Sequence, residues 1–239
     1  MIQNFKNVVV LTGAGVSVPS GLPDYRSING LYTREWNGLP PEVLLSRPYF
    51  QQNPSSHYGY VIEHLFHPNV VPNVAHLLLA KWEKQGIVKA VITQNIDGLH
   101  EKAGSTTIPF HGTMSYVTCN ECKEDISIET LADCYKNSTD YYKCPKCNNV
   151  YDTNVVLYGD SGYYLGGPGF HEVVQLIQEA DLLIIAGTSL KVFPFAGLHT
   201  YKNRKCKVWI VNKTDEHFGV SYDEFINGDV VDVFKSWEK

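Results

Sequence analysis

The most specific chemical pattern in the sequence is a set of four cysteines. They form two CxxC pairs, Cys119/Cys122 and Cys144/Cys147, with residues 123–143 between them. Two such pairs can close a tetrahedral zinc site, and four thiolates leave no open coordination position, so the spacing predicts a structural zinc ion. Because zinc-binding thiols must stay reduced and no convincing signal-peptide cleavage site follows the first apolar run, we expect a cytoplasmic protein.

A second pattern is a glycine-rich loop that follows an apolar run. The sequence Gly-Ala-Gly-Val-Ser at 13–17 would let backbone N–H groups approach a pyrophosphate. Just behind it, Asp24, Tyr25 and Arg26 offer a carboxylate, a stacking ring and a phosphate-pairing guanidinium. The loop lacks the GxGxxG spacing of the Rossmann fingerprint. From these residues alone, a dinucleotide site and a tight strand-to-helix turn both stay open.

A third pattern combines amide, carboxylate and imidazole groups. Gln94, Asn95 and Asp97 follow another apolar run, and His111 precedes Gly112 farther along the chain. Such groups suit hydroxyl recognition and proton transfer on a ribose. We expect the other histidines to be structural or on the surface, and they include His57, His64, His67, His76, His171 and His217.

Short apolar runs without alternation must position these groups. They lie at 7–11, 89–93, 181–186 and 207–211, and helical patterns at 73–85 and 170–180 fall between them. Continuous apolar runs are typical of strands buried on both faces of a parallel sheet, so the predicted fold class is α/β with helices on both faces. Each run ends in a polar or glycine cluster, which predicts one crevice at the carboxyl ends of the strands.

Two regions do not follow this alternation. We expect residues 28–72 to form a helical insertion or cofactor loop, and residues 115–152, which hold the cysteine pairs, to form a small zinc-binding module. The nucleotide-binding domain would then comprise residues 1–27, 73–114 and 153–239. The isolated Cys134 and Cys206 are interpreted as core or surface thiols.

The charge balance argues against two classes of partner. The 239 residues carry 20 Lys and Arg against 25 Asp and Glu, a net charge of −5. The segment between the first and last zinc-binding cysteine is itself acidic, which opposes phosphate binding, so we expect no nucleic acid partner. No apolar run approaches the roughly 20 residues that span a bilayer, so we expect no membrane span.

Together the motifs resemble the sirtuin family of NAD-dependent protein deacylases. They occur in that family's order along nearly the whole chain, at residues 13–17, 21–26, 72–76, 93–100, 111–112, the two CxxC pairs, 155–160, 187–190 and 211–212. The resemblance implies a Rossmann-like NAD-binding domain, a small zinc module and a cleft between them. It also implies that His111 is the general base and that Asn95 helps to position the ribose.

By position, the resemblance implies a set of cofactor contacts and a set of peptide contacts. The expected NAD-binding residues are Gly13, Ala14, Gly15, Val18, Asp24, Tyr25, Arg26, Gln94, Asn95, Ile96, Asp97, His111, Gly187, Thr188, Ser189, Asn212, Lys213, Asp229 and Val230. The expected peptide-binding residues are Val155, Val156, Tyr158 and Gly159. The substrate peptide would pair with this segment as an added strand.

The implied reaction removes an acyl group, here expected to be acetyl, from a protein lysine and gives nicotinamide and O-acyl-ADP-ribose. We expect a monomer that acts on acylated-lysine proteins. The alternatives are a protein mono-ADP-ribosyltransferase or a longer-chain deacylase in the same cleft. More distant ones are an NAD-dependent dehydrogenase and a non-catalytic NAD or ADP-ribose sensor.

Two departures from the family pattern concern specificity. Phe193 and Phe195 flank Pro194 where small residues are frequent, which could reshape the nucleotide or acyl pocket. Tyr58 and Val61 stand where members that prefer acidic acyl groups carry a Tyr-x-x-Arg pair. Without that Arg an acyl carboxylate has no partner, so we expect weak desuccinylation.

Overall fold

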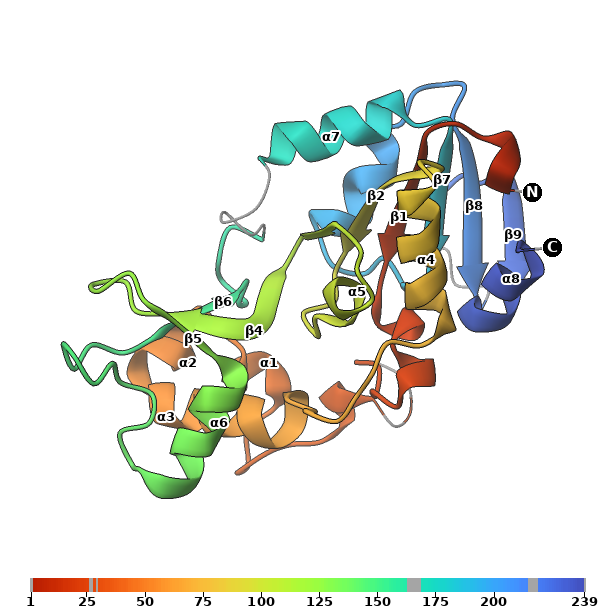
Figure 1. Cartoon of the computed structure of the whole chain (residues 1–239). Coiled ribbons are helices and arrows are strands. Elements are labelled where there is room, and N and C mark those ends of the chain that lie inside the picture. The colour runs from red at the N-terminus through yellow and green to blue at the C-terminus, as the bar shows by residue number, and fades with distance from the viewer. Residues whose placement is uncertain (1, 26–27, 29, 163–168, 215–218, 239) are drawn as a thin grey trace.

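A six-stranded parallel sheet forms the centre of the larger part of the molecule (Figure 1). The computed structural model describes residues 2–25, 28, 30–162, 169–214 and 219–238. The strand order is β3-β2-β1-β7-β8-β9, with bounds β1 (Val8–Thr12), β2 (Val88–Thr93), β3 (Thr107–Pro109), β7 (Leu182–Ala186), β8 (Lys207–Asn212) and β9 (Glu224–Asn227). The α/β class and the parallel sheet are confirmed. The four central strands lie within about two residues of the predicted runs, whereas the short edge strands β3 and β9 were not predicted.

Each face of this sheet packs against helices. Along β1, Val8 and Val10 enter one apolar cluster, and Val9 and Leu11 enter the other. The first cluster is covered by α4 (Val74–Lys84) and α8 (Val230–Ser236), and the second by α7 (Phe170–Glu179) and the 3-10 helix η6 (Phe195–Tyr201). Both faces of the sheet are therefore buried, which is why the strands carry apolar residues without alternation.

The loops between β1 and α4 are tied to the start of that helix. Asn73 caps α4 by accepting a hydrogen bond from the Ala75 N–H at 2.9 Å. Its Nδ2 also donates to the Val16 carbonyl at 2.8 Å and to Ser20 Oγ at 2.9 Å. Asn73 therefore caps the helix and also holds the glycine-rich loop in place. This loop contains two short 3-10 turns, η2 (Ala14–Val16) and η3 (Val18–Ser20).

A second body lies beside the sheet, at the lower left in Figure 1. It contains the antiparallel sheet β5-β4-β6 and several short helices. The elements are η4 (Leu31–Thr33), α1 (Pro41–Leu44), α2 (Arg47–Gln52), α3 (Pro54–Tyr60), the π-helical turn η5 (Val61–Leu65), β4 (Gly112–Thr118), β5 (Asp125–Ser127), α6 (Ile128–Asn137) and β6 (Asp152–Val155). We call this body, residues 31–66 and 112–160, the zinc half. The described parts of 2–25, 73–111 and 169–238 are the sheet half, which also includes η1 (Ile2–Asn4) and α5 (Leu99–Lys102).

The two segments of the zinc half share one apolar core. Leu44, Phe50 and Tyr58 from the insertion pack in the same cluster as Val117 and Leu131 from the cysteine-bearing segment. The core of the zinc half is therefore built from both segments together. None of the helices in the described part of the chain has the length and apolar content to cross a bilayer.

Candidate functional site

A cleft of about 660 Å³ lies at the carboxyl ends of four parallel strands. On the sheet side its walls come from the loops after β1, β2 and β7 and from the end of β8. On the opposite side they come from η4, Leu45 and residues 155–160 of the zinc half. The cleft therefore occupies the place predicted for a ligand crevice, between the two halves of the molecule.

Glycine is required where the loops after β1 and β7 meet. A Cβ on Gly15 would lie 2.7 Å from the Gly187 Cα, and a Cβ on Gly187, whose φ is +60°, would lie 2.6 Å from the Val16 nitrogen. The Gly15 N–H donates to the Gly187 carbonyl at 2.8 Å. With no side chains between them, the two loops present backbone to the cleft, which is the surface that a pyrophosphate needs.

His111 lines the cleft at the junction between the halves. Burial lowers its pKa from 6.5 to about 4, so the imidazole is neutral near pH 7 and can accept a proton. Its ring lies 5.4 Å from the Phe110 ring and 6.1 Å from the Phe195 ring, centroid to centroid. Its backbone carbonyl accepts the Val156 N–H at 2.9 Å, which links the histidine to the opposite wall.

A serine joins the two polar residues after β2. Asn95 Nδ2 donates to the Gly13 carbonyl and to Ser17 Oγ, both at 3.1 Å. Ser17 Oγ in turn donates to Asp97 Oδ2 at 2.7 Å, and burial raises the pKa of that carboxyl group. The amide, hydroxyl and carboxylate are thus fixed relative to the glycine-rich loop. Ser17 was not among the predicted site residues, although it belongs to the glycine motif.

A second polar chain holds the far end of the cleft. Thr188 Oγ1 donates to Gln94 Oε1 at 2.8 Å, and Asn212 Nδ2 donates to the Thr188 carbonyl at 3.2 Å. Beyond them, Lys213 pairs with Asp229, with 2.8 Å between Nζ and Oδ2. The loops after β2, β7 and β8 are therefore held together by side chains that also face the cleft.

Most of the predicted cofactor residues line this cleft, and three described ones do not. The lining ones are Ala14, Gly15, Val18, Asp24, Tyr25, Gln94, Asn95, Ile96, His111, Gly187, Thr188, Ser189, Asn212, Lys213 and Val230. Gly13 and Asp97 lie behind the wall and contact it through Asn95 and Ser17, while Asp229 caps α8 and pairs with Lys213. Arg26 lies outside the described residues. The sequence also gave no indication of Tyr32, Leu45, Lys191 or Thr214, which line the cleft too.

The four predicted peptide residues line the opposite wall, at and just after β6. In the strand order β5-β4-β6, this strand is at an edge, so its outer side has no strand partner among the described residues. The segment is braced from behind, because Arg47 forms ion pairs with Asp152 at 2.7 Å and with Asp160 at 2.8 Å. Just after β6, the Tyr158 N–H donates to the Leu45 carbonyl at 3.0 Å and its carbonyl accepts the Arg47 N–H at 2.9 Å, so the open edge is that of β6 itself.

The two phenylalanines near Pro194 have different environments. Phe195 is fully buried in the sheet half beside Phe110 and supports the His111 ring. Phe193 lines the cleft and is 74% exposed. Of the two, only Phe193 can contact a ligand directly.

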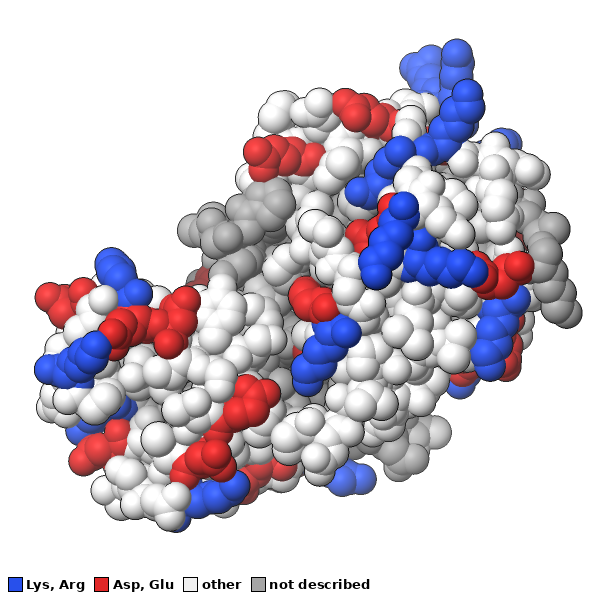
Figure 2. All heavy atoms as spheres, in the orientation of Figure 1, with Lys and Arg blue, Asp and Glu red and all other residues white. Residues whose placement is uncertain are grey.

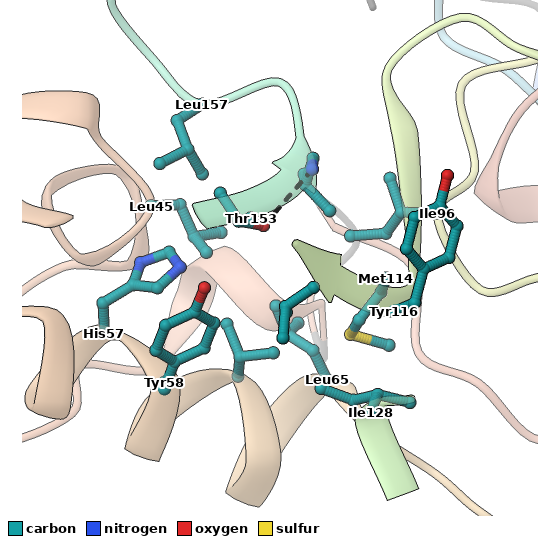
Figure 3. A pocket seen from close by; sticks show the side chains of 13 residues that line it. Leu45, His57, Tyr58, Leu65, Ile96, Met114, Tyr116, Ile128, Thr153 and Leu157 are labelled. Carbon is teal, nitrogen blue, oxygen red and sulfur yellow. Dashed lines mark hydrogen bonds between the residues drawn. The ribbon is translucent and has the colours of Figure 1, made fainter. Parts of the chain in front are cut away.

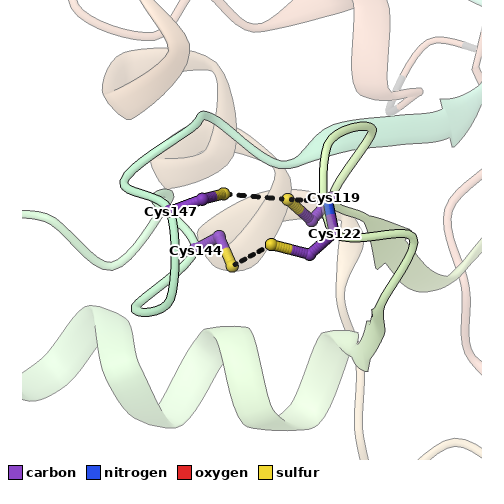
Figure 4. Close-up of side chains that lie close together, drawn as sticks. All are labelled: Cys119, Cys122, Cys144 and Cys147. Atoms are coloured by element: carbon purple, nitrogen blue, oxygen red, sulfur yellow. Dashed lines mark hydrogen bonds between the residues drawn. The ribbon is translucent and has the colours of Figure 1, made fainter.

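The cysteine quartet has the dimensions of a zinc site (Figure 4). The four Sγ atoms of Cys119, Cys122, Cys144 and Cys147 all lie within 4.8 Å of one another. The Cys119–Cys147 and Cys122–Cys144 sulfur pairs are 3.5 Å and 4.0 Å apart. Tetrahedral zinc with Zn–S bonds of about 2.3 Å needs sulfurs about 3.8 Å apart, so the set fits a zinc ion. Cys134 is exposed and Cys206 is buried in the core, away from this set.

Two further buried histidines lie beneath the glycine-rich loop. His100 Nε2 is 3.0 Å from Thr12 Oγ1, and the His76 Nδ1 accepts the Asn73 N–H at 3.3 Å. The two rings are 4.7 Å apart, and burial lowers the pKa values to about 3 and about 4. Both are core histidines with neutral rings, which agrees with the structural role predicted for His76. His100 contacts Thr12 directly, whereas His76 reaches the loop through Asn73.

Comparison with known proteins agrees with this arrangement. The model of the Sir2 family matches residues 13–194. An NAD-dependent protein deacetylase of Listeria innocua is 40% identical over 239 residues, covering 98% of this chain and 96% of its own length. Among solved structures, a Sir2 complex with a p53 peptide and NAD+ has a TM-score of 0.82 at 33% identity, and Sir2Tm bound to a propionylated peptide has 0.82 at 32% identity. Both matches cover 98% of this chain and 93% of the other.

Proposed function

Because the chain belongs to the Sir2 family, we propose that it is an NAD-dependent protein-lysine deacetylase. The observation that carries the proposal is a single cleft that contains a backbone cradle for phosphates, the neutral His111 and an edge strand for a peptide. The products would be the free lysine, nicotinamide and O-acetyl-ADP-ribose. NAD supplies the ribose carbon that gives up nicotinamide and the hydroxyl that receives the acyl group.

The sheet half provides the groups that would hold NAD. The close contact between Gly15 and Gly187 keeps side chains out of the cleft where the pyrophosphate would lie, and Asn212 and Lys213 lie toward the far end of the cleft. Near the other end, the Ser17 hydroxyl orients Asn95 and Asp97. These side chains would position the ribose and the carboxamide, so that the reacting carbon faces the zinc half.

His111 would act as the general base. Its imidazole is neutral at pH 7 and lines the cleft between the cofactor wall and the peptide wall. A neutral imidazole can take the proton of a ribose hydroxyl as that oxygen attacks the acyl carbon. Because the Val156 N–H is bound to the His111 carbonyl, the base and the peptide strand would keep a fixed spacing.

The zinc half would bind the acylated peptide. The outer edge of β6 can pair with an extended chain, a mode of binding that reads backbone and tolerates many sequences. Beyond β6 the Tyr158 backbone is already bonded to Leu45 and Arg47, so Tyr158 and Gly159 would contact the peptide as part of the cleft wall and not as a paired strand. A zinc ion bound by the four cysteines would be structural, because their sulfurs would occupy all four positions around it. It would hold the wall that carries this strand.

We also maintain that the protein is a cytoplasmic monomer without a nucleic acid partner. The net charge of −5 supports the last point, and acidic and basic side chains are interspersed on the visible face of the zinc half in Figure 2. Such a surface does not attract a polyanion. Sedimentation of the purified protein tests the monomer, and a mobility shift with DNA or RNA tests the partner.

The function is tested by incubating an acetyl-lysine peptide with the protein and NAD and following it by mass spectrometry. We expect loss of the acetyl group together with release of nicotinamide and acetyl-ADP-ribose. His111→Ala should lower the rate by about 100-fold or more, as expected for loss of a general base. His171→Ala, a change at an exposed histidine, is the matched control and should keep the rate.

Two other outcomes would replace the proposal. Transfer of ADP-ribose onto protein without deacetylation would indicate the ADP-ribosyltransferase. NAD binding without nicotinamide release from any acyl peptide would indicate the sensor.

A further inference from the structure

A small cavity lies directly beyond the cleft, inside the zinc half (Figure 3). Four residues line both spaces, and they are Leu45, Ile96, Val155 and Leu157. The cavity volume is about 10 Å³, enough for one water-sized group. An acyl chain that enters the cleft between Ile96 and Val155 would therefore direct its far end at this space.

His57 carries an unpaired acceptor at this cavity. The side chain is 1% exposed, and its Nδ1 lies 2.8 Å from the Leu44 carbonyl oxygen. Because a carbonyl oxygen only accepts, Nδ1 holds the proton and Nε2 holds a lone pair. Nε2 is buried and has no hydrogen-bond partner in the structure. In Figure 3 the ring points from α3 toward the space between Leu45, Tyr58 and Thr153.

Two other polar side chains that line the cavity, Tyr58 and Thr153, already have hydrogen-bond partners. Tyr58 Oη donates to the Tyr151 carbonyl at 2.8 Å, and Thr153 Oγ1 accepts the Val155 N–H at 3.2 Å. The lining includes no Lys, Arg, Asp or Glu. Burial also lowers the pKa of His57 to about 4, so the ring stays neutral at pH 7. Such a site favours an uncharged hydrogen-bond donor on an otherwise apolar chain.

We propose that this cavity receives the far end of the acyl group and that His57 selects hydroxyacyl-lysines, such as 3-hydroxybutyryl-lysine or 4-hydroxybutyryl-lysine. The proposal rests on the deacylase function above and names a substrate class for it. The acyl hydroxyl donates to Nε2 and takes no part in the chemistry. Hydroxyacyl-lysine, NAD and water give lysine, nicotinamide and O-hydroxyacyl-ADP-ribose. The lysine amide bond and the ribose–nicotinamide bond break, and an ester to the ribose forms.

The physical reason is the difference between a paired and an unpaired buried acceptor. A plain butyryl group would cover Nε2 without bonding it, whereas a hydroxyl would satisfy it. A site built around a hydrogen bond discriminates more strongly than one that only measures length. Tyr58 and Val61 also line the cavity, so it has no cation to pair with a succinyl carboxylate.

The test compares kcat/KM for peptides that carry butyryl-, 3-hydroxybutyryl- or 4-hydroxybutyryl-lysine. At least one hydroxybutyryl peptide should exceed the butyryl peptide by about 10-fold, the value of one good hydrogen bond. His57→Asn can keep the bond to the Leu44 carbonyl but has no acceptor at the Nε2 position, so this ratio should fall to about 1. His57→Gln places an amide oxygen near the Nε2 position and should keep part of the ratio.

Each result of this comparison leads to a different conclusion. Equal kcat/KM for butyryl and both hydroxybutyryl peptides in the wild type would overturn the proposal, as would an unchanged ratio in His57→Asn. Thermal unfolding of both variants shows whether they are folded, and ratios are compared only within one variant. If the wild type also fails to remove acetyl groups, the deacylase function itself is wrong. If it removes them but shows no hydroxyl preference, only the role of His57 is wrong.

Discussion

The two walls of the cleft are built in different ways. On the sheet side, loops leave strands that are buried on both faces, and the loops are bonded to one another, as Thr188 after β7 is to Gln94 after β2. On the zinc side, the wall stands on a core that two distant segments share and that includes the ligands Cys119 and Cys144. We therefore expect the sheet side to keep its shape without a metal, and the zinc side to depend on both its segments and on zinc.

This contrast assigns different tasks to the walls. The sheet side holds the groups that a cofactor of fixed structure would meet, so rigidity there serves binding. The zinc side holds the edge strand and the cavity beside His57, where substrates differ from one another. The four tryptophans can report on the contrast separately. Trp36 packs on Tyr60 in the zinc half, while Trp82 and Trp209 both contact Trp237 in the sheet half.

Removing zinc should give the largest effect. In Cys144→Ser, or after chelation, we expect deacetylation to fall by about 100-fold or more. A structural zinc site contributes roughly 10 kcal/mol to the fold that holds it, and without it the peptide wall should unfold. Trp36 fluorescence should shift toward the solvent-exposed value while the signal of the sheet tryptophans, measured in Trp36→Phe, stays native. Cys134→Ser, at the exposed cysteine, is the control and should keep zinc, activity and both signals. Full activity without zinc would contradict the contrast.

The sequence predicted the sheet wall better than the zinc wall for a physical reason. Strands buried on both faces leave a continuous apolar run, and a run such as 181–186 is visible without knowledge of its neighbours. The CxxC pairs are equally visible because metal ligation fixes residue type and spacing. The predicted residues of the cleft followed from these two signals and from the family resemblance.

What the sequence could not indicate depends on contacts between distant segments. The helices α1 to α3 are only 4 to 7 residues long, too short for a periodic pattern, and their apolar residues pack on the cysteine-bearing segment. The role of Ser17 follows from its contact with Asp97, 80 positions away. The free acceptor on His57 depends on Leu44 taking the other ring nitrogen. No local pattern encodes these pairings.

Acid should weaken the sheet half through its buried histidine pair. Burial lowers the pKa values of His76 and His100 below the 6.5 of an exposed histidine, to about 4 and about 3. Between pH 6.5 and about 4 the unfolded chain therefore binds more protons, and the free energy of unfolding falls as the pH falls. Each histidine contributes about 1.4 kcal/mol per pH unit, so we expect nearly 3 kcal/mol per unit from the pair.

Urea unfolding of the Trp36→Phe protein at pH 6.0 and 5.0 measures this slope. In the same background, His100→Asn should reduce it by about half of the value expected for the pair. His171→Ala should leave it unchanged, because this histidine is exposed. A slope that is independent of His100 would show that the pair is not neutral in the native state.

We expect a smaller loss of activity on substitution of Ser17, which holds Asn95 and Asp97 in place on the sheet wall. In Ser17→Ala, Asn95 loses an acceptor and the half-buried Asp97 loses a donor. Loss of one such bond to a charged group costs about 1.5–3 kcal/mol, so kcat/KM for NAD should fall by about 10-fold or more. KM for the peptide should change little, since its wall is intact. Ser236→Ala, at an exposed serine on α8, is the control, and a change confined to peptide KM would contradict the assignment.

The smallest effect tests how firmly the two segments of the zinc half are joined. The Glu63 carboxylate accepts from Trp36 Nε1 at 3.1 Å and from Tyr135 Oη, so it ties the insertion to α6. The carboxylate is 41% exposed, which limits its contribution, and Glu63→Gln should lower the stability of the zinc half by about 0.5–1 kcal/mol. The Trp36 transition should move to lower urea, while the sheet transition, measured in Trp36→Phe, should not. If both transitions moved together, the halves would unfold as one unit, and the zinc wall would depend on the sheet as much as on its own core. Glu129→Gln, at an exposed position on the same helix α6, controls for the loss of one negative charge.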